Sequence, residues 1–283
     1  MKLWKAGSAT FVIAALALTA TGCGSDGETE SPSRSAASGS KGKIVIGIKF
    51  DQPGVGLKQP DGSYAGFDVD VARYVAKKLG YMPGQIQFKK APSAQREQMI
   101  KNGDVKFVVA SYSINDKREK EVDFAGPYFL AHQDLLVRAG DKSITKPEDL
   151  NGKKLCSVTG STSAQNVKEK LAPKADLLQR GGYSECLTGL ENKAVDAVTT
   201  DDAILAGYAA QAQHKGKFKL AGLKLSDEKY GIGLKEGDVD LKKKIDAALT
   251  AMVADGSWDK AVQANFGPAG FANEPAPKIT AAN

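Results

Sequence analysis

One short segment carries side chains that are suited to binding a carboxylate. Residues 111–118 read SYSINDKR and follow an apolar run, so Ser111 and Ser113 come at the end of a predicted strand, with Arg118 shortly after them. An arginine guanidinium is planar and donates two parallel hydrogen bonds, which suits the two oxygens of a carboxylate. The segment indicates an anion site, and the alternative is that Arg118 belongs to a charged, solvated face.

A second segment combines hydroxyls with the start of a helix. Residues 160–164 read GSTSA, after a predicted strand at 153–158. Backbone N–H groups at a helix start, together with the hydroxyls of Ser161 and Thr162, hold a carboxylate or a phosphate well. The same residue types are also ordinary helix N-caps, so both interpretations stay open.

The sequence lacks the signatures of the common catalytic and metal sites. It has no GxxxxGK[ST], HExxH or GxSxG motif, and its two histidines, His132 and His214, have no cysteine at metal-ligand spacing. Of the net charge of +6, two positive charges, Lys2 and Lys5, precede the N-terminal apolar run, and the remainder is spread along the chain and forms no basic stripe. We therefore expect no catalytic residues, metal, cofactor or nucleic-acid partner.

Alternating strand-like and helix-like segments must position the two polar segments. A β-branched run at 43–48 and strand-like segments at 85–88 and 105–110 alternate with helical patterns such as 67–79, and a second set of this kind follows residue 138. This order is typical of β-α-β units with a mostly parallel sheet. Because 283 residues are many for a single core, we predict an α/β protein of two lobes.

The lobes follow from the order of these segments. We assign residues 43–131 and 230–271 to lobe 1, residues 132–229 to lobe 2 and residues 272–283 to a frayed C-terminal tail, with crossings between the lobes near 129–137 and 225–231. Ligands of open α/β sheets bind beyond the carboxyl ends of the strands. A cleft between the lobes would therefore contain Ser111 from lobe 1 and Asp201 from lobe 2.

The first 42 residues are predicted to be an export signal and a tether. Lysines precede an apolar run at 9–20, which is too short to span a bilayer comfortably. The following ATGC (20–23) resembles a bacterial lipoprotein box, in which the cysteine carries diacylglycerol after cleavage. We predict a signal peptide at 1–22, lipidation of Cys23 and a flexible tether up to residue 42. An ordinary signal peptide with a buried free Cys23 is the alternative.

Two further cysteines, Cys156 and Cys186, complete the count of three. If Cys23 carries a lipid, these two remain in a chain exported to a compartment that permits disulfides. A bond between them is the simplest arrangement. Two buried thiols are the alternative, because spacing alone does not establish the bonding geometry.

Five motifs, in this order and at roughly this spacing, resemble a known family. They are GFDVDVA (66–72), SYSINDKR (111–118), FAGPY (124–128), GSTSAQ (160–165) and TTDD (199–202). Over about residues 43–267 the chain is similar to the family 3 (polar amino acid) solute-binding proteins of ABC importers. Within that family, DQPGVG (51–56), PSAQRE (92–97) and the positions of Cys156 and Cys186 look most like the glutamate-binding lipoproteins. The resemblance implies a two-lobed, periplasmic-binding-protein-like (type II) fold with a hinge and a ligand cleft.

The resemblance also implies roles for individual residues. In the family, an arginine at the place of Arg118 pairs with the α-carboxylate of the ligand. Groups at the places of Ser111, Ser113 and Thr162 assist it. An aspartate at the place of Asp201 accepts the α-ammonium, so these contacts recognise any amino acid.

Selectivity is implied at other positions. In members that bind acidic amino acids, an arginine at the place of Arg96 meets the side-chain carboxylate. Members that bind basic ligands have an acid at the place of Lys49 and a stacking aromatic where this chain has Gln52. The opposite sign at Lys49 suits an anionic ligand side chain, and a solvated loop containing Lys49 and Gln52 is the alternative.

The function implied is binding and transport, without catalysis. We expect a monomeric lipoprotein on the outer face of the cytoplasmic membrane, which captures L-glutamate or aspartate by closing its lobes. It would deliver the ligand to an ABC permease and its ATPase. Two alternatives stay open: an amino-acid-processing enzyme (dehydratase-like) on the same fold, and a sensory or adhesion surface lipoprotein.

Overall fold

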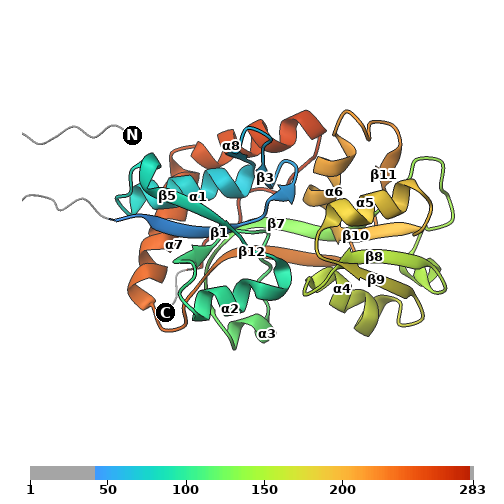
Figure 1. Ribbon diagram of the computed structural model, residues 1–283, viewed down its shortest axis with the longest axis horizontal. Coiled ribbons are helices and arrows are strands. Elements are labelled where there is room, and N and C mark those ends of the chain that lie inside the picture. Colours follow the sequence, from blue (N-terminus) through green and yellow to red (C-terminus); the bar gives the residue numbers. More distant parts are fainter. Residues whose placement is uncertain (1–41, 281–283) are drawn as a thin grey trace, which may run out of the picture. The chain divides into compact units, whose positions relative to one another are not determined.

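The computed structural model describes residues 42–280 (Figure 1). The predicted signal peptide, Cys23 and the predicted tether up to residue 41 lie outside the described residues. Within 42–280, none of the helices has the length and apolar character needed to cross a membrane.

One mixed sheet of nine strands runs through the described chain in the order β5-β1-β6-β12-β7-β10-β8-β9, with β11 paired to β7. Its strands are β1 (Ile44–Ile48), β5 (Ile86–Lys90), β6 (Phe107–Val108), β7 (Asp123–Arg138), β8 (Lys154–Val158), β9 (Asp176–Arg180), β10 (Ala197–Asp201), β11 (Phe218–Leu220) and β12 (Ser226–Leu234). A smaller sheet contains β2 (Asp51–Gln52), β3 (Gly56–Lys58) and β4 (Tyr64–Ala65).

Two long antiparallel strands, β7 and β12, join two sets of parallel strands. The first set is β1, β5 and β6, and the second is β8, β9 and β10. β12 pairs with β6 near its carboxyl end, whereas β10 pairs with the second half of β7. In Figure 1, β7 and β12 pass from one set to the other. The predicted crossings at 129–137 and 225–231 fall within this strand pair, apart from residue 225.

Helices cover both sets of strands. They are α1 (Phe67–Lys78), α2 (Arg96–Lys101), α3 (Asp116–Glu119), α4 (Thr162–Asn166), α5 (Tyr183–Glu191), α6 (Asp202–Ala209), α7 (Val239–Ala254) and α8 (Ser257–Phe266), with short turns at Pro83–Gln85, Ser93–Gln95, Pro147–Leu150, Val167–Leu171 and Gly267–Ala269. α1 shows why the helices form where they do. Phe67, Val71 and Val75 recur four residues apart and are all buried, so they make the apolar stripe of an amphipathic helix.

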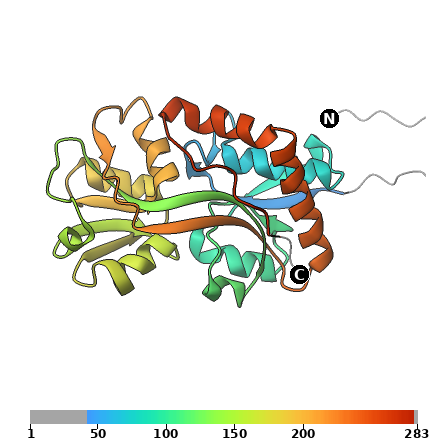
Figure 2. The same cartoon turned by 180° about the vertical axis from the view of Figure 1, so that it is seen from behind.

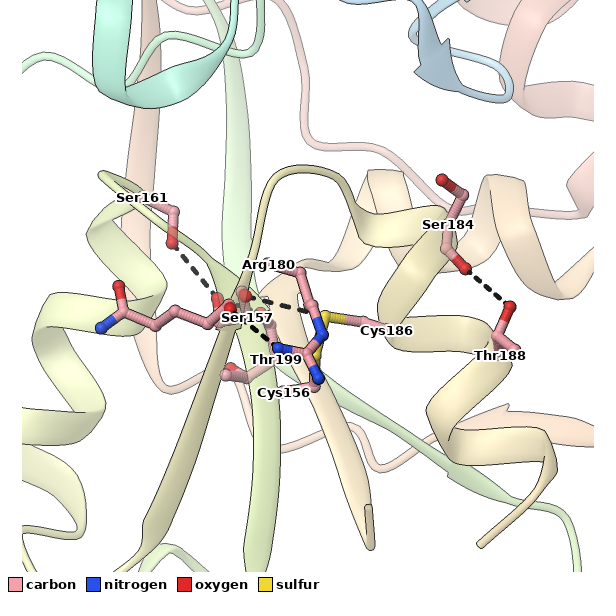
Figure 3. The surroundings of a disulfide bond; sticks show 9 residues. Cys156, Ser157, Ser161, Arg180, Ser184, Cys186, Thr188 and Thr199 are labelled. Atoms are coloured by element: carbon pink, nitrogen blue, oxygen red, sulfur yellow. Dashed lines mark hydrogen bonds between the residues drawn. A yellow bond between two sulfur atoms is a disulfide. The ribbon is translucent and has the colours of Figure 1, made fainter. Parts of the chain in front are cut away.

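A disulfide joins Cys156 in β8 to Cys186 in α5 (Figure 3), with the Cα atoms 5.5 Å apart. Both residues are buried. In this structure they form a disulfide and are not two free thiols. The bond ties α5 to the strand that precedes the GSTSA segment. Next to it, Ser157 Oγ donates to Thr199 O at 2.8 Å and lies 3.2 Å from Ser161 Oγ. The end of β8 that leads to the GSTSA segment is thus bonded covalently to α5 and by a hydrogen bond to β10.

The C-terminal residues differ from the frayed tail that the sequence predicts. Up to Thr280 they lie against β7 and pack on the main core through Ala276 and Ile279 (Figure 2). Thr280 donates from its backbone N–H and its hydroxyl to Gly126 O, at 3.2 and 3.1 Å. Glu274 Oε1 lies 3.1 Å from His132 Nε2 of β7. The prediction was wrong because two apolar side chains and a few polar contacts hold a segment that has no periodic pattern.

Candidate ligand-binding site

A small cavity of about 10 Å³, almost filled by its own lining, lies where the carboxyl ends of the two parallel sets face each other. Its lining includes the following residues that the sequence predicts: Gln52, Arg96, Ser111, Arg118, Ser161, Thr162 and Asp201. It also includes Ser93, Ser163, Tyr183 and Ile204, which the sequence reasoning did not single out. Two predicted residues, Lys49 and Ser113, lie directly behind this lining. Lys49 Nζ donates to Ser93 Oγ at 2.7 Å, and Ser113 O accepts from Arg118 Nη1 at 2.7 Å.

Three buried cations gather on the lobe 1 side of the cavity: Lys49, Arg96 and Arg118 are 5%, 2% and 7% exposed. The nearest counter-charge to Arg118 is Glu97, whose Oε1 lies 3.5 Å from Arg118 Nε. Burial, followed by the repulsion from Arg96, lowers the pKa of Arg118 to about 10. The same two causes, in the same order, lower the pKa of Lys49 well below its ordinary value. Excess buried positive charge of this kind favours an anionic ligand.

Arg96 points inward because it starts α2 on the face that also buries Met99 and Ile100. Its Nη1 donates to Ala110 O at 2.8 Å and to Ser111 O at 3.3 Å. Its buried Nε has no hydrogen-bond partner among residues 42–280. A buried donor without a partner is costly, so a ligand acceptor beside Arg96 would gain more here than at an exposed arginine.

The lobe 2 side of the cavity carries acidic side chains instead of cations. Asp201 is 4% exposed, and its Oδ2 accepts from Tyr230 Oη at 2.5 Å. Burial, followed by the nearby charge of Glu228, raises the pKa of Asp201 to about 8. Glu228 is also buried, and its carboxylate accepts from Thr162 Oγ1 and Ser226 Oγ, both at 2.9 Å.

Glu228 was missed because it lies in the predicted crossing at 225–231, outside the motifs that indicate the binding site. One signal was present, since side chains in a strand alternate between faces. Glu228 stands two residues before buried Tyr230 on β12 and therefore shares its face.

Asp68, in the GFDVDVA motif, positions the lobe 1 backbone at the cavity. It is fully buried and accepts from Ser111 N at 2.6 Å and Tyr128 Oη at 2.7 Å. Ser111 has a φ of 43°, which non-glycine residues rarely adopt, and the hydrogen bond from its N–H offsets part of that strain. The strand before Ser111, β6, is shorter than predicted, because it covers Phe107–Val108 instead of residues 105–110. Ser111 Oγ then donates to Gln52 Oε1 at 3.1 Å.

In the GSTSA segment, Ser161 does two things. Its hydroxyl caps α4 by accepting from Ala164 N at 3.0 Å, and it also lines the cavity. The N-cap and cavity interpretations are therefore compatible.

The two sides of the cavity touch through backbone that leaves no room for side chains. A Cβ on Gly160 would lie 2.8 Å from Ala94 Cα, and a Cβ on Gly207 would lie 1.9 Å from Pro53 O. Arg118 Nη2 donates across the cavity to Gly160 O at 3.1 Å. Such close approach is available to glycine alone.

The profile of the bacterial extracellular solute-binding proteins, family 3, matches residues 44–268. The chain belongs to this family. Its two-lobed α/β fold is thus the type II fold expected from the sequence, and as a member of an extracellular family it is an exported protein.

Several known proteins resemble this solute-binding protein. The glutamate-binding protein GluB of Corynebacterium efficiens is 42% identical over 272 residues, which cover 93% of this chain and 90% of the relative. The glutamine-binding protein GlnH of an ABC transporter of Bacillus subtilis is 43% identical over 227 residues, 80% of this chain and 81% of the relative.

Solved structures extend the likeness to the fold of the solute-binding protein. An ancestral arginine-binding protein bound to glutamine superposes with a TM-score of 0.74 at 36% identity, covering 80% of this chain and 99% of the other. An ancestral amino-acid-binding protein described as a precursor of cyclohexadienyl dehydratase has a TM-score of 0.71 at 29% identity, covering 80% and 95%. The enzyme-related neighbour is thus less similar in sequence than the binding proteins GluB and GlnH.

Proposed function

We propose that this protein captures L-glutamate outside the cytoplasmic membrane and delivers it to an ABC permease. The observation that carries the proposal is the separation of charge across one small cavity. Lys49, Arg96 and Arg118 are buried on one side, and Asp201 is buried on the other.

Each ionised group of glutamate has an opposite charge in this arrangement. Arg118 would bind the α-carboxylate, Asp201 the α-ammonium, and Arg96 with Lys49 behind it the side-chain carboxylate. Glutamine brings the same α-groups but no second carboxylate, so it would leave Arg96 without a counter-charge. An uncompensated buried charge costs about 3–5 kcal/mol, which corresponds to several hundredfold or more in affinity. The names of GluB and GlnH, at similar identity, support an amino-acid ligand without choosing between the two.

Capture would proceed by closure of the lobes about the strand pair β7 and β12. We assign residues 43–131 and 230–271 to lobe 1 and residues 132–229 to lobe 2. The ligand would contact both lobes and so favour the closed state. We further propose that the mature chain is a monomer tethered by a diacylglycerol on Cys23, with the bond between Cys156 and Cys186 formed after export. The chain would bind its ligand without transforming it.

The test is calorimetry of the purified soluble domain with glutamate, aspartate, glutamine and asparagine, followed by recovery of the bound ligand. We expect glutamate to bind about a hundredfold or more tighter than glutamine and to be recovered unchanged. Arg96→Gln should remove most of that preference. Arg73→Gln, an exposed arginine of lobe 1, should keep it. Equal affinities of the unmodified protein for glutamate and glutamine would overturn the glutamate assignment, and a chemically altered ligand would favour the enzyme alternative.

A further inference from the structure

Tyr112 lies between the two serines of the SYSINDKR segment and is completely buried. It does not line the cavity. Its ring packs in a cluster with Met99, Ile100 and Val108, on the side of the sheet away from the main core. Its position is that of an ordinary core aromatic, but its ring contacts charged side chains.

Both cavity arginines lie against this one ring. The Cζ atom of Arg96 is 4.0 Å from the centroid of the Tyr112 ring, and the Cζ atom of Arg118 is 5.1 Å from it. The π-face of an aromatic ring attracts cations within about 6 Å, and this attraction is larger where water is excluded. Burial of all three side chains therefore makes these contacts stronger than surface contacts of the same geometry.

The surroundings hold the ring in this place. Phe124 packs against it edge-on, with the centroids 4.8 Å apart and an interplanar angle of 71°. On β12, a Cβ at Gly233 would lie 2.6 Å from Tyr112 Cε1, so the ring occupies the space that a side chain at this position would need. The orientation of the ring is thus determined by the fold and does not depend on the ligand.

The hydroxyl of Tyr112 has a small part in this arrangement. Burial raises the pKa of Tyr112, so the side chain stays neutral and does not act as an anionic partner of the arginines. The hydroxyl forms no hydrogen bond of normal geometry within residues 42–280. The face of the ring is what the arginines contact.

Two like charges this close repel each other, and Glu97, which follows Arg96 in α2, offsets part of that repulsion with its Oε1 3.5 Å from Arg118 Nε. Arg96 is held by carbonyls of Ala110 and Ser111, and Arg118 by carbonyls of Ser113 and Gly160. These acceptors are separate for each arginine. The ring of Tyr112 is the group that both guanidinium groups share.

We propose that Tyr112 is a positioning residue, whose ring holds the guanidinium groups of Arg96 and Arg118 side by side so that they bind the two carboxylates of one ligand as a unit. This inference rests on the proposed function, because it takes the two arginines to be the carboxylate-binding groups. It assigns a specificity role to a residue that does not touch the ligand.

The experiment compares Tyr112→Leu with Tyr112→Phe, using calorimetry with glutamate and with glutamine. Tyr112→Phe keeps the ring and should bind both ligands within about twofold of the unmodified protein. Tyr112→Leu should lower the affinity for glutamate about thirtyfold to a hundredfold, because two buried cation–π contacts are lost. The affinity for glutamine, which would contact Arg118 alone, should fall less. The ratio of the glutamate affinity to the glutamine affinity should therefore fall.

Phe107→Leu is the matched control. Phe107 is equally buried in lobe 1, but it belongs to the main core on the other side of the sheet. It should lower the unfolding temperature as Tyr112→Leu does, while leaving the affinity ratio unchanged. The proposal is overturned if Tyr112→Leu weakens both ligands equally, if it matches Phe107→Leu in binding, or if Tyr112→Phe loses as much as Tyr112→Leu. If the unmodified protein prefers glutamine, the glutamate assignment fails by itself, and the loss of glutamine binding in Tyr112→Leu still tests the contact with Arg118.

Discussion

The two sides of the cavity hold their polar groups in place in different ways. The lobe 1 side buries whole cationic side chains, and Arg96 and Arg118 satisfy part of their donors with backbone carbonyls. The lobe 2 side presents hydroxyls and one carboxylate, Asp201, at strand and helix ends. Long flexible cations need a platform and acceptors to hold them, whereas short groups are oriented by the backbone that carries them. On the proposed function, lobe 1 would set the charge of the ligand and lobe 2 its orientation.

Removal of Arg118 should have the largest effect on this division. Arg118→Ala deletes the group proposed to pair with the α-carboxylate of any amino acid, and it also deletes the hydrogen bond across the cavity to Gly160. We expect glutamate and glutamine to lose affinity alike, by several hundredfold or more, in calorimetry.

Lys117→Ala removes the exposed neighbouring cation and serves as the control for that loss, with binding expected to stay near that of the unmodified protein. A loss in Arg118→Ala that is confined to glutamate would mean that the roles of the arginines are exchanged.

A smaller effect is expected where the two sides meet. Gly207→Ala places a methyl group against Pro53 O, where a Cβ would be 1.9 Å away, so closure should be hindered and affinity for glutamate should fall tens of fold. Alanine favours a helix over glycine by about 1 kcal/mol, so the ligand-free domain should unfold at the same temperature or higher.

Gly189→Ala is the matched change in α5, because its Cβ would meet only Val195 of the same lobe at 3.5 Å. It should bind as the unmodified protein does. Equal binding by the two glycine variants would show that contact of the lobes at Pro53 is not needed for capture.

The smallest expected effect is a pH dependence that arises on the lobe 2 side. Asp201 has a raised pKa of about 8, so at pH 7 it is mostly protonated, and pairing with the α-ammonium must release that proton. Affinity should therefore rise up to tenfold per pH unit between about pH 6 and 8 and level off above. Calorimetry at pH 7 in buffers of different ionisation enthalpy should show release of up to one proton.

The same group affects stability with a definite sign. The pKa of an aspartate is about 4 in an unfolded chain, so between pH 4 and 8 the folded state binds this proton and the unfolded state does not. The contribution of Asp201 to the stability of the ligand-free domain should thus decline as pH rises through this range. Asp201→Asn should flatten both profiles, and unchanged profiles in that variant would assign the proton to another group.

Periodicity and motif order determined much of this protein from the sequence alone. The four-residue spacing in α1 and the β-branched runs predict elements that the structure contains, because local patterns report which face is buried. Motif identity pointed to the family, and the family match confirmed it. Arg118 and Asp201, which the motifs indicate, line one cavity because they follow strands whose ends meet, and their binding roles stay predictions.

Only the tertiary structure decided the features that depend on distant neighbours. Tyr112 is a hydrophobic residue in sequence, and its contact with two arginines arises because α2 and α3 pack around one turn. Glu228 lies outside the sequence motifs, and only the path of β12 places it beside Thr162. The C-terminal residues up to Thr280 are held by contacts with β7. Side chains far apart along the chain share no local pattern, so their mutual contacts and charges exist only once the sheet has brought them together.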